Sequence, residues 1–216
     1  MNKLTIDTAE ALALQLRSKL GLGTHEPINA KTLIRQLDYM LHYRPLSENL
    51  LGMSLKSPDS LYKFILVNSN TTRGRQHFTI AHEIYHLEFE EDIYPHYNRT
   101  DREVNVSERN ADMFACALLM PRQGIISKIP ASELASKNIS IETCLTLGQL
   151  YGVSHSTLVF RLKELKLITQ ENEQKLMQIK VKQEAYYRGF DLSLYNSGNN
   201  NVMISDYGLE ARQLYN

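Results

Sequence analysis

The spacing of apolar residues divides the chain into helical and strand-like parts. Apolar side chains recur three and four positions apart over four early stretches, which is the period of an amphipathic helix. Helices are therefore predicted at 8–20, 29–43, 79–90 and 107–120. Between the second and third of these, short apolar runs replace the helical period and predict two strands, at 50–55 and 63–68.

The last third of the chain returns to a helical pattern. From about Ser140 it has the layout of a helix-turn-helix, with a turn at Gly152 and a second helix that Ser154 caps and that runs to about Lys166. A further helical stretch is predicted over 171–187, and a run rich in asparagine follows it.

These periods predict an α+β fold with a small antiparallel sheet, two long helices and a helix-turn-helix-like module. We expect three segments along the chain. Residues 1–138 would form a domain around the sheet, 139–190 the helical module, and 191–216 a flexible C-terminal tail.

The composition narrows the class of protein. The 216 residues include 24 Lys and Arg and 24 Asp and Glu, so the formal net charge is zero. Proteins that coat nucleic acid or bind membranes through a polybasic patch carry an excess of positive charge, and both classes are disfavoured. No apolar run is long enough for a transmembrane helix. With two cysteines and an N-terminus without the apolar core of a signal peptide, we expect a cytoplasmic protein.

The sequence HEIYH at residues 82–86 is an H-E-x-x-H motif inside a predicted helix. His82 and His86 lie one turn apart, so both imidazoles face one point, as a zinc site requires. Glu83 is placed to take a proton from a metal-bound water. The same pentapeptide also arises by chance on exposed helices. The opposite side of this helix is apolar and would face a core, through Ile80, Ile84 and Leu87.

A zinc site of this kind needs a third protein ligand. Phe89 and Asp92 stand where a metzincin has glycine and histidine, which excludes that class. Glu108, at the start of the predicted helix 107–120, is the preferred ligand. His96, in the intervening loop, is a rival.

Asp112 lies one helical turn after Glu108. It is placed to accept the remaining N–H of a ligand histidine and so to fix the orientation of the ring. The alternative is that both acids are solvated on the surface. Ala111 and Ala115 on the same face argue against this alternative, because small side chains allow the motif helix to approach.

The residues around both motifs resemble the ImmA/IrrE metallopeptidases. The resemblance rests on FTIAHEIYH at 78–86 and on the E-x-x-A-D-x-F-A-x-x-L-L-M-P pattern at 108–121, and it covers about 50–170. Asn110 stands where the family often has an acidic residue, which affects no assigned ligand.

This resemblance implies a zincin-like fold in which His82, His86 and Glu108 bind the metal and Glu83 is the catalytic acid/base. The metal would be Zn²⁺, although a His₂Glu site also accepts Mn²⁺ or another divalent ion. The resemblance further implies an endopeptidase that cleaves a helix-turn-helix repressor and thereby derepresses genes of a mobile element or a stress response. Related proteins are proposed as toxins paired with such a repressor as antitoxin.

The developing oxyanion needs a donor in addition to the metal. The sequence offers His77 before the motif and Tyr94, His96 and Tyr97 after it, and it does not choose among them.

The helix-turn-helix-like segment, residues 140–168, also suggests a DNA-binding regulator. Its second helix offers few base-reading groups at its start, and Arg161 and Lys163 come late and are offset by Glu164. We therefore expect a packing module that supports the peptidase or its protein substrate, and no nucleic-acid partner. A catalytically idle protein that binds a repressor is the remaining alternative.

Overall fold

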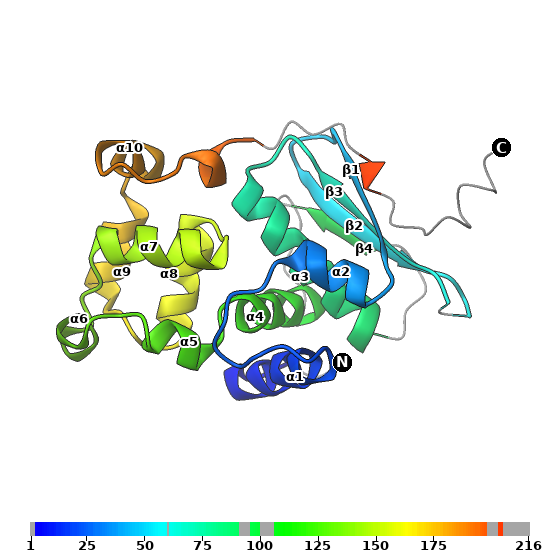
Figure 1. Ribbon diagram of the computed structural model, residues 1–216, viewed down its shortest axis with the longest axis horizontal. Helices are drawn as coiled ribbons and strands as arrows, with labels where there is room; N and C mark the ends of the chain where they lie inside the picture. Colours follow the sequence, from blue (N-terminus) through cyan, green and yellow to red (C-terminus); the bar gives the residue numbers. More distant parts are fainter. Residues whose placement is uncertain (1–2, 60, 91–95, 100–105, 198–202, 205–216) are drawn as a thin grey trace.

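The computed structural model describes residues 3–59, 61–90, 96–99, 106–197 and 203–204. The molecule runs from a β-sheet at one end, through a central layer of helices, to a group of short helices at the other end (Figure 1). Ten α-helices, one 3-10 helix and five strands are present among the described residues. The predicted α+β class is confirmed.

The sheet has the strand order β4-β2-β3-β1-β5. Its strands are β1 (Met40–Arg44), β2 (Leu50–Lys56), β3 (Lys63–Asn68), β4 (His96–Arg99) and β5 (Met203–Ile204). β1 runs parallel to β3, with Leu41 opposite Ile65, and the other neighbouring strands are antiparallel. The expectation of a purely antiparallel sheet is therefore wrong for one pairing. Leu41 and Ile65 are both fully covered, and a slip of one residue would turn them to the opposite face.

The segment predicted as one helix over 29–43 is a helix followed by a strand. α2 (Ala30–Gln36) begins after Asn29, whose side chain caps it as predicted. The helix stops before Asp38, which adopts a left-handed φ of 57°. The apolar residues that follow alternate in burial along β1, because pairing with β3 buries every second side chain.

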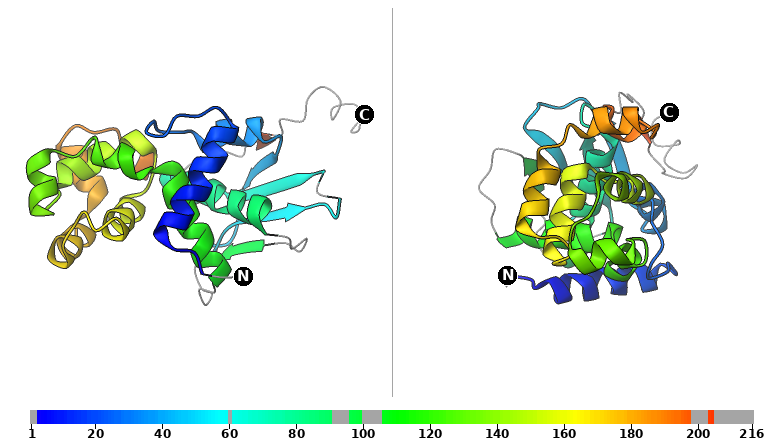
Figure 2. Two further views of the ribbon diagram at one scale, coloured as in Figure 1. Left: turned by 90° about the horizontal axis from the view of Figure 1, so that it is seen from below. Right: turned by 90° about the vertical axis from the view of Figure 1, so that its left-hand side faces the viewer.

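Three long helices stack on one another beside the sheet, and α3 (Arg73–Phe89) is the one that contacts it. α3 packs on β2 and β3, α4 (Val106–Leu119) packs along α3, and α1 (Ile6–Lys19) lies along α4 (Figure 2). α3 begins at Arg73 and not at Thr79 as predicted. The reason is a cap, since the Thr72 side chain accepts a hydrogen bond from the backbone N–H of Arg75.

Short helices make up the rest of the described chain. They are α5 (Arg122–Ile126), α6 (Ala131–Ser136), α7 (Ile141–Tyr151), α8 (His155–Glu164), α9 (Gln170–Met177), α10 (Val181–Tyr187) and the 3-10 helix η1 (Ser193–Tyr195). The predicted turn between α7 and α8 is confirmed, with Gly152 in a left-handed conformation and Ser154 capping α8. The helix predicted over 171–187 is two helices, because the chain turns after Gln178, the C-cap of α9.

One hydrophobic core extends from the sheet side of the molecule into the short helices. Ile84 of α3, Phe114 of α4 and Leu147 and Leu162 of α7 and α8 belong to the same buried cluster. Buried Arg161 of α8 also donates to the Met120 carbonyl at the end of α4. The core thus crosses the position at which the sequence suggested a domain boundary.

Part of the predicted flexible tail has regular structure. η1 packs against α3, and β5 pairs with β1 at the edge of the sheet. The other residues from 198 onward lie outside the described residues. None of the described helices has both the length and the apolar character needed to cross a lipid bilayer.

Candidate metal centre

The H-E-x-x-H motif lies in the middle of α3, where the helix is covered on all sides. His82 and His86 are 0% and 2% exposed, and their Nε2 atoms lie 3.1 Å apart. On the sheet-facing and core-facing side, Ile80 and Ile84 are fully buried, as predicted. The helix is therefore anchored by its apolar side while it directs both imidazoles toward α4.

α4 supplies the third donor from its first turn. Glu108 is buried, with Oε2 3.0 Å from His82 Nε2 and Oε1 3.8 Å from His86 Nε2. The ligand atoms of His82, His86 and Glu108 all lie within 4.8 Å of one another. The close approach of the two helices depends on Ala111 and Ala115 of α4, both completely buried.

Two carboxylates orient the imidazoles. Asp112 Oδ1 lies 2.8 Å from His82 Nδ1, at the position predicted for it. Glu90 Oε2 lies 2.8 Å from His86 Nδ1, and Glu90 also accepts a hydrogen bond from the Ser107 hydroxyl. Because carboxylates only accept, each Nδ1 would donate its hydrogen to its carboxylate, and each Nε2 would then present a lone pair to a cation held together with Glu108.

This donor set fits a divalent metal. Zinc bound tetrahedrally at about 2.0–2.1 Å from each ligand would separate the ligand atoms by roughly 3.3 Å. The two imidazole nitrogens lie 3.1 Å apart, and the two oxygens of Glu108 lie 3.0 Å from His82 Nε2 and 3.8 Å from His86 Nε2, so each donor pair is near that separation. Two imidazole nitrogens and a carboxylate facing one point are donors that attract a cation, so His82, His86 and Glu108 are the residues that would hold it.

Glu83 follows His82 on α3 and is completely buried against β2. The Ser54 hydroxyl of β2 donates to Glu83 Oε2 at 2.6 Å. Gly52 allows this close approach, because a Cβ atom there would lie 2.5 Å from Thr79 Cγ2 and 2.8 Å from the Leu66 carbonyl oxygen. The strand and the motif helix therefore hold the carboxylate in one orientation beside the metal ligands.

The other predicted substrate contacts are placed differently. His77 lies on the first turns of α3 with both ring nitrogens engaged, by the Gly152 carbonyl and by the Ala30 N–H. Tyr97 is half-exposed on β4. The backbone of His96 belongs to β4, but its side chain, like all of Tyr94, lies outside the described residues. Both ring nitrogens of His77 thus hold neighbouring segments together, and the described contacts do not choose an oxyanion donor among the candidates.

Three residues that contact the centre were not predicted from the sequence: Glu90, Ser107 and Ser54. Glu90 carried a usable signal, since it stands four positions after His86 on the same helical face. Ser107 and Ser54 carried none, because only the packing of α4 and β2 brings their hydroxyls to the site.

Comparison with known protein families adds an independent finding. The family model described as Peptidase_M78, IrrE N-terminal-like domain, matches residues 35–163. The matched region includes four of the five strands, the metal centre and the α7–α8 turn. No curated protein matches the chain.

Proposed function

Because the chain belongs to the Peptidase_M78 family of IrrE N-terminal-like domains, we propose that it is a zinc-dependent endopeptidase. Its substrate would be a regulatory protein. One observation supports this proposal most strongly. His82 Nε2, His86 Nε2 and the Glu108 carboxylate lie close together, beside the buried Glu83. Of the divalent ions that such a set accepts, zinc is the proposed one because two imidazoles and one carboxylate are typical zinc ligands.

The residues of the chain divide the chemistry between them. A bound zinc ion supplies Lewis acidity, which activates water and polarises a peptide carbonyl. The Glu83 carboxylate accepts a proton from the attacking water molecule and passes it to the amine that leaves when the peptide bond breaks. Ser54 keeps that carboxylate in position, and Asp112 and Glu90 keep the imidazoles in the tautomer that binds metal.

We further propose that the substrate is a helix-turn-helix repressor and that the protein acts in the cytoplasm. The support is the resemblance to ImmA/IrrE peptidases, in which repressor cleavage releases genes of mobile elements or stress responses. In the alternative, the protein is a toxin or partner that binds such a repressor without cutting it.

DNA binding through residues 140–168 is the weaker candidate. Arg161, one of the cations it would use, is 1% exposed and paired with Glu10 and Glu164. Lys163 pairs with Glu173 at 2.7 Å. His155 at the start of α8 is buried and bonded to the Leu176 carbonyl. These side chains support the core and its surface, and they leave little positive charge for phosphates.

The test uses the purified, zinc-loaded protein and the repressor encoded nearest to its gene. We expect wild type to cleave the repressor and Glu83→Gln to lose at least about a hundredfold in rate while retaining zinc. Glu171→Gln, on the exposed face of α9, is the matched control and should cleave normally. If wild type and Glu83→Gln bind the repressor equally and leave it intact, the protein acts by binding and the peptidase proposal is wrong.

A further inference from the structure

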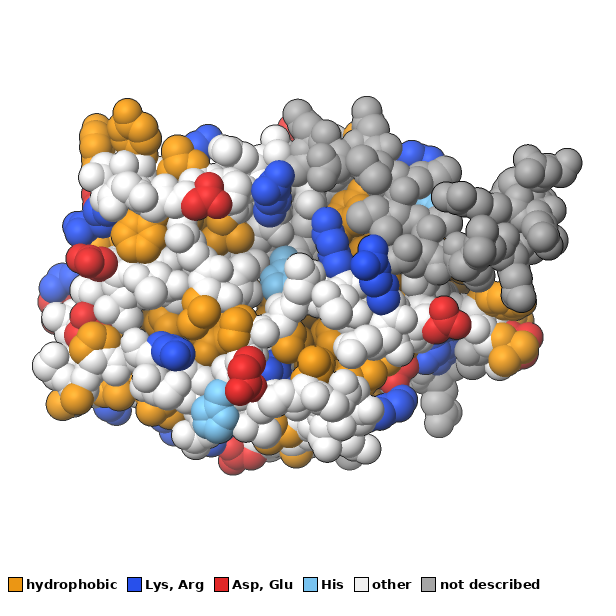
Figure 3. Space-filling view, in the orientation of Figure 1, with side chains coloured by type: hydrophobic (Ala, Val, Ile, Leu, Met, Phe, Trp, Pro, Cys, Tyr) orange, Lys and Arg blue, Asp and Glu red, His pale blue; other side chains and the backbone are white. Residues whose placement is uncertain are grey.

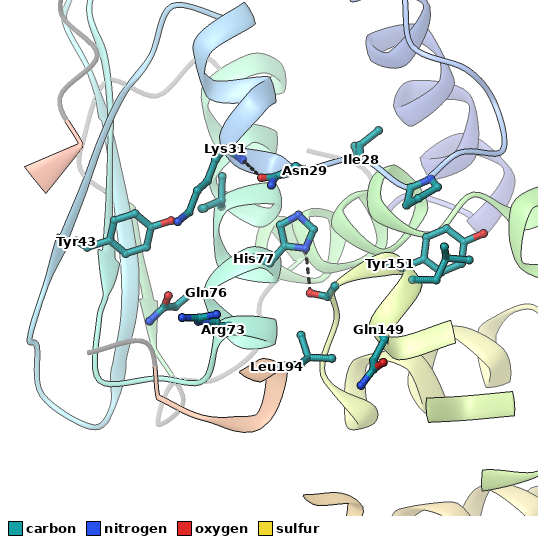
Figure 4. Close-up of a pocket in the computed structure, with 14 residues that line it drawn as sticks. Ile28, Asn29, Lys31, Tyr43, Arg73, Gln76, His77, Gln149, Tyr151 and Leu194 are labelled. Atoms are coloured by element: carbon teal, nitrogen blue, oxygen red, sulfur yellow. Dashed lines mark hydrogen bonds between the residues drawn. The ribbon is translucent and has the colours of Figure 1, made fainter. Parts of the chain in front are cut away.

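A cavity lies at the first turn of α3, and none of the metal ligands lines it. It has a volume of about 610 Å³, and its walls come from α2, the start of α3, the end of α7 and η1 (Figure 4). Its volume is within the range of about 300–1,000 Å³ that is typical of small-molecule sites. The proposed peptidase chemistry makes no use of it.

The charged side chains that line this cavity are both positive. Lys31 and Arg73 line it, and none of its lining residues is an aspartate or a glutamate. Within the described residues neither Lys31 nor Arg73 has an ion-pair partner within 4.0 Å. Burial, and the nearby Arg73, lower the pKa of Lys31. Figure 3 shows basic side chains gathered on this face between the sheet and the short helices. Arg73 also interacts electrostatically with Asp191, which lies outside the lining and is not in ion-pair contact with Arg73. Two lining cations without an ion-pair partner favour an anionic occupant.

A buried hydroxyl points toward the same place. Tyr43 is 3% exposed, and its hydroxyl has no hydrogen-bond partner among the described residues. Figure 4 shows this hydroxyl turned toward the end of Lys31, whose Nζ lies 4.9 Å from the centre of the Tyr43 ring. Buried polar groups are rarely left without a partner, so an occupant that accepts a hydrogen bond here would complete the site.

Two further features favour an anion. The first turns of α3, a helix of 17 residues, line the cavity through Arg73, Gln76 and His77, and this is the half of the helix where its dipole favours negative charge. His77 stays neutral, because its Nδ1–H donates to the Gly152 carbonyl and its Nε2 accepts from Ala30 N–H. The binding charge is therefore that of Lys31 and Arg73.

From these observations we propose that the cavity binds a small organic phosphate. Its phosphate would lie between Lys31, Arg73 and the Tyr43 hydroxyl, since phosphate offers several acceptor oxygens to such donors. Its organic body would pack on the apolar part of the wall, formed by Ile28, Leu150 and Leu194. The occupant would contact both α3 and the α7–α8 turn. This proposal does not require the protein to be a peptidase.

The experiment is calorimetric titration of the full-length, zinc-loaded protein with adenosine 5′-monophosphate, inorganic phosphate and adenosine as probes. We expect the monophosphate to bind at least tenfold more tightly than either of the other two. Lys31→Gln and Arg73→Gln should each weaken its binding at least tenfold, and Tyr43→Phe about threefold or more. Lys128→Gln removes an exposed lysine outside the cavity and should leave binding unchanged.

Repeating the titration after chelation separates this cavity from the metal centre, because phosphate can also ligate zinc. Binding at the cavity should survive removal of the metal and the Glu83→Gln substitution. The proposal is overturned if the monophosphate fails to bind at millimolar concentration, or if Lys31→Gln and Lys128→Gln bind it equally. It is also overturned if binding disappears with the metal, or if inorganic phosphate binds as tightly as the nucleotide.

Discussion

At the scale of single residues, the two imidazoles of the metal centre are held by carboxylates in different surroundings. The Glu90 side chain is 3% exposed and the Asp112 side chain 41% exposed. A hydrogen bond to a buried charged group is stronger than one that competes with water. His86 should therefore depend more on Glu90 than His82 depends on Asp112.

Removing either carboxylate charge should weaken metal binding. Glu90→Gln is expected to lower zinc affinity about 10–100-fold, and Asp112→Asn to lower it by less, because water can replace the exposed Asp112 carboxylate. The measurement is zinc competition against a chromophoric chelator, with Glu171→Gln as the exposed control. Equal affinity of Glu90→Gln and wild type would show that Glu90 does not orient His86.

The Ser54 hydroxyl should affect turnover and leave metal binding unchanged. Ser54→Ala removes a charge-assisted hydrogen bond to Glu83, which is worth about 1.5–3 kcal/mol, so the rate of repressor cleavage should fall roughly 10–100-fold. Zinc affinity should not change, because the Ser54 hydroxyl donates to Glu83 and not to a metal ligand. Ser54→Thr keeps the hydroxyl and should restore part of the rate. A loss of zinc in Ser54→Ala would indicate a structural role.

At the scale of elements, α3 joins the parts of the molecule. Its middle carries the metal ligands, while its first turn packs against the backbone of the α7–α8 turn. A Cβ atom at Gly74 would lie 2.8 Å from the Ser154 nitrogen and 3.0 Å from the Val153 carbonyl carbon. A hydrogen bond from His77 of α3 to the Gly152 carbonyl joins the same helix and turn. The backbone of the helix-turn-helix-like module thus packs directly against α3. Glycine at position 74 allows this, because it has no Cβ atom.

Substituting this glycine should destabilise the fold. Gly74→Ala is expected to cost about 1–3 kcal/mol in the free energy of unfolding, because backbone atoms of the neighbouring turn would have to move. Gly148→Ala is the matched control. Its nearest contact would be an ordinary 3.6 Å from the Val153 oxygen, and alanine favours the interior of α7, so stability should hold or rise. Urea denaturation measures both, and equal stabilities would contradict the packing described.

At the scale of the whole molecule, the neutral histidines His77, half-buried, and His155, buried, hold distant segments together. His77 connects α2, α3 and the α7–α8 turn, and His155 of α8 donates to the Leu176 carbonyl in α9. Burial lowers the pKa of both groups from the ordinary value of 6.5. Between that value and their lowered pKa, the unfolded chain binds more protons than the folded chain. Stability therefore falls as pH drops below about 6.5.

A change at His155 should reduce this dependence on pH. His155→Gln keeps an N–H donor for the Leu176 carbonyl and removes the titrating ring. We expect the free energy of unfolding of wild type to fall between pH 7.5 and pH 5.5, and that of His155→Gln to fall less, by denaturant titration at both pH values. The substitution leaves the rest of the chain unchanged, so the difference between the two proteins isolates His155. Parallel declines would refute its contribution.

The sequence by itself determined the local part of the metal centre. Residues one turn apart on a helix must share a face, so His82, Glu83 and His86 could be assigned from spacing, and Asp112 from its distance to Glu108. Helix caps were readable for the same local reason at Asn29 and Ser154. The strands 50–56 and 63–68 followed from their apolar runs.

Tertiary structure decided everything that depends on residues far apart in the chain. Leu41 continues the helical spacing of Leu33, Ile34 and Leu37, yet it lies in β1, because the chain after Asp38 pairs in parallel with β3. Ser54 reaches Glu83, and Ser107 reaches Glu90, only after strand and helix have packed. The cavity between Lys31, Tyr43 and Arg73 likewise exists only where three elements meet. Spacing along a chain fixes which face a side chain occupies, whereas packing fixes what that face meets.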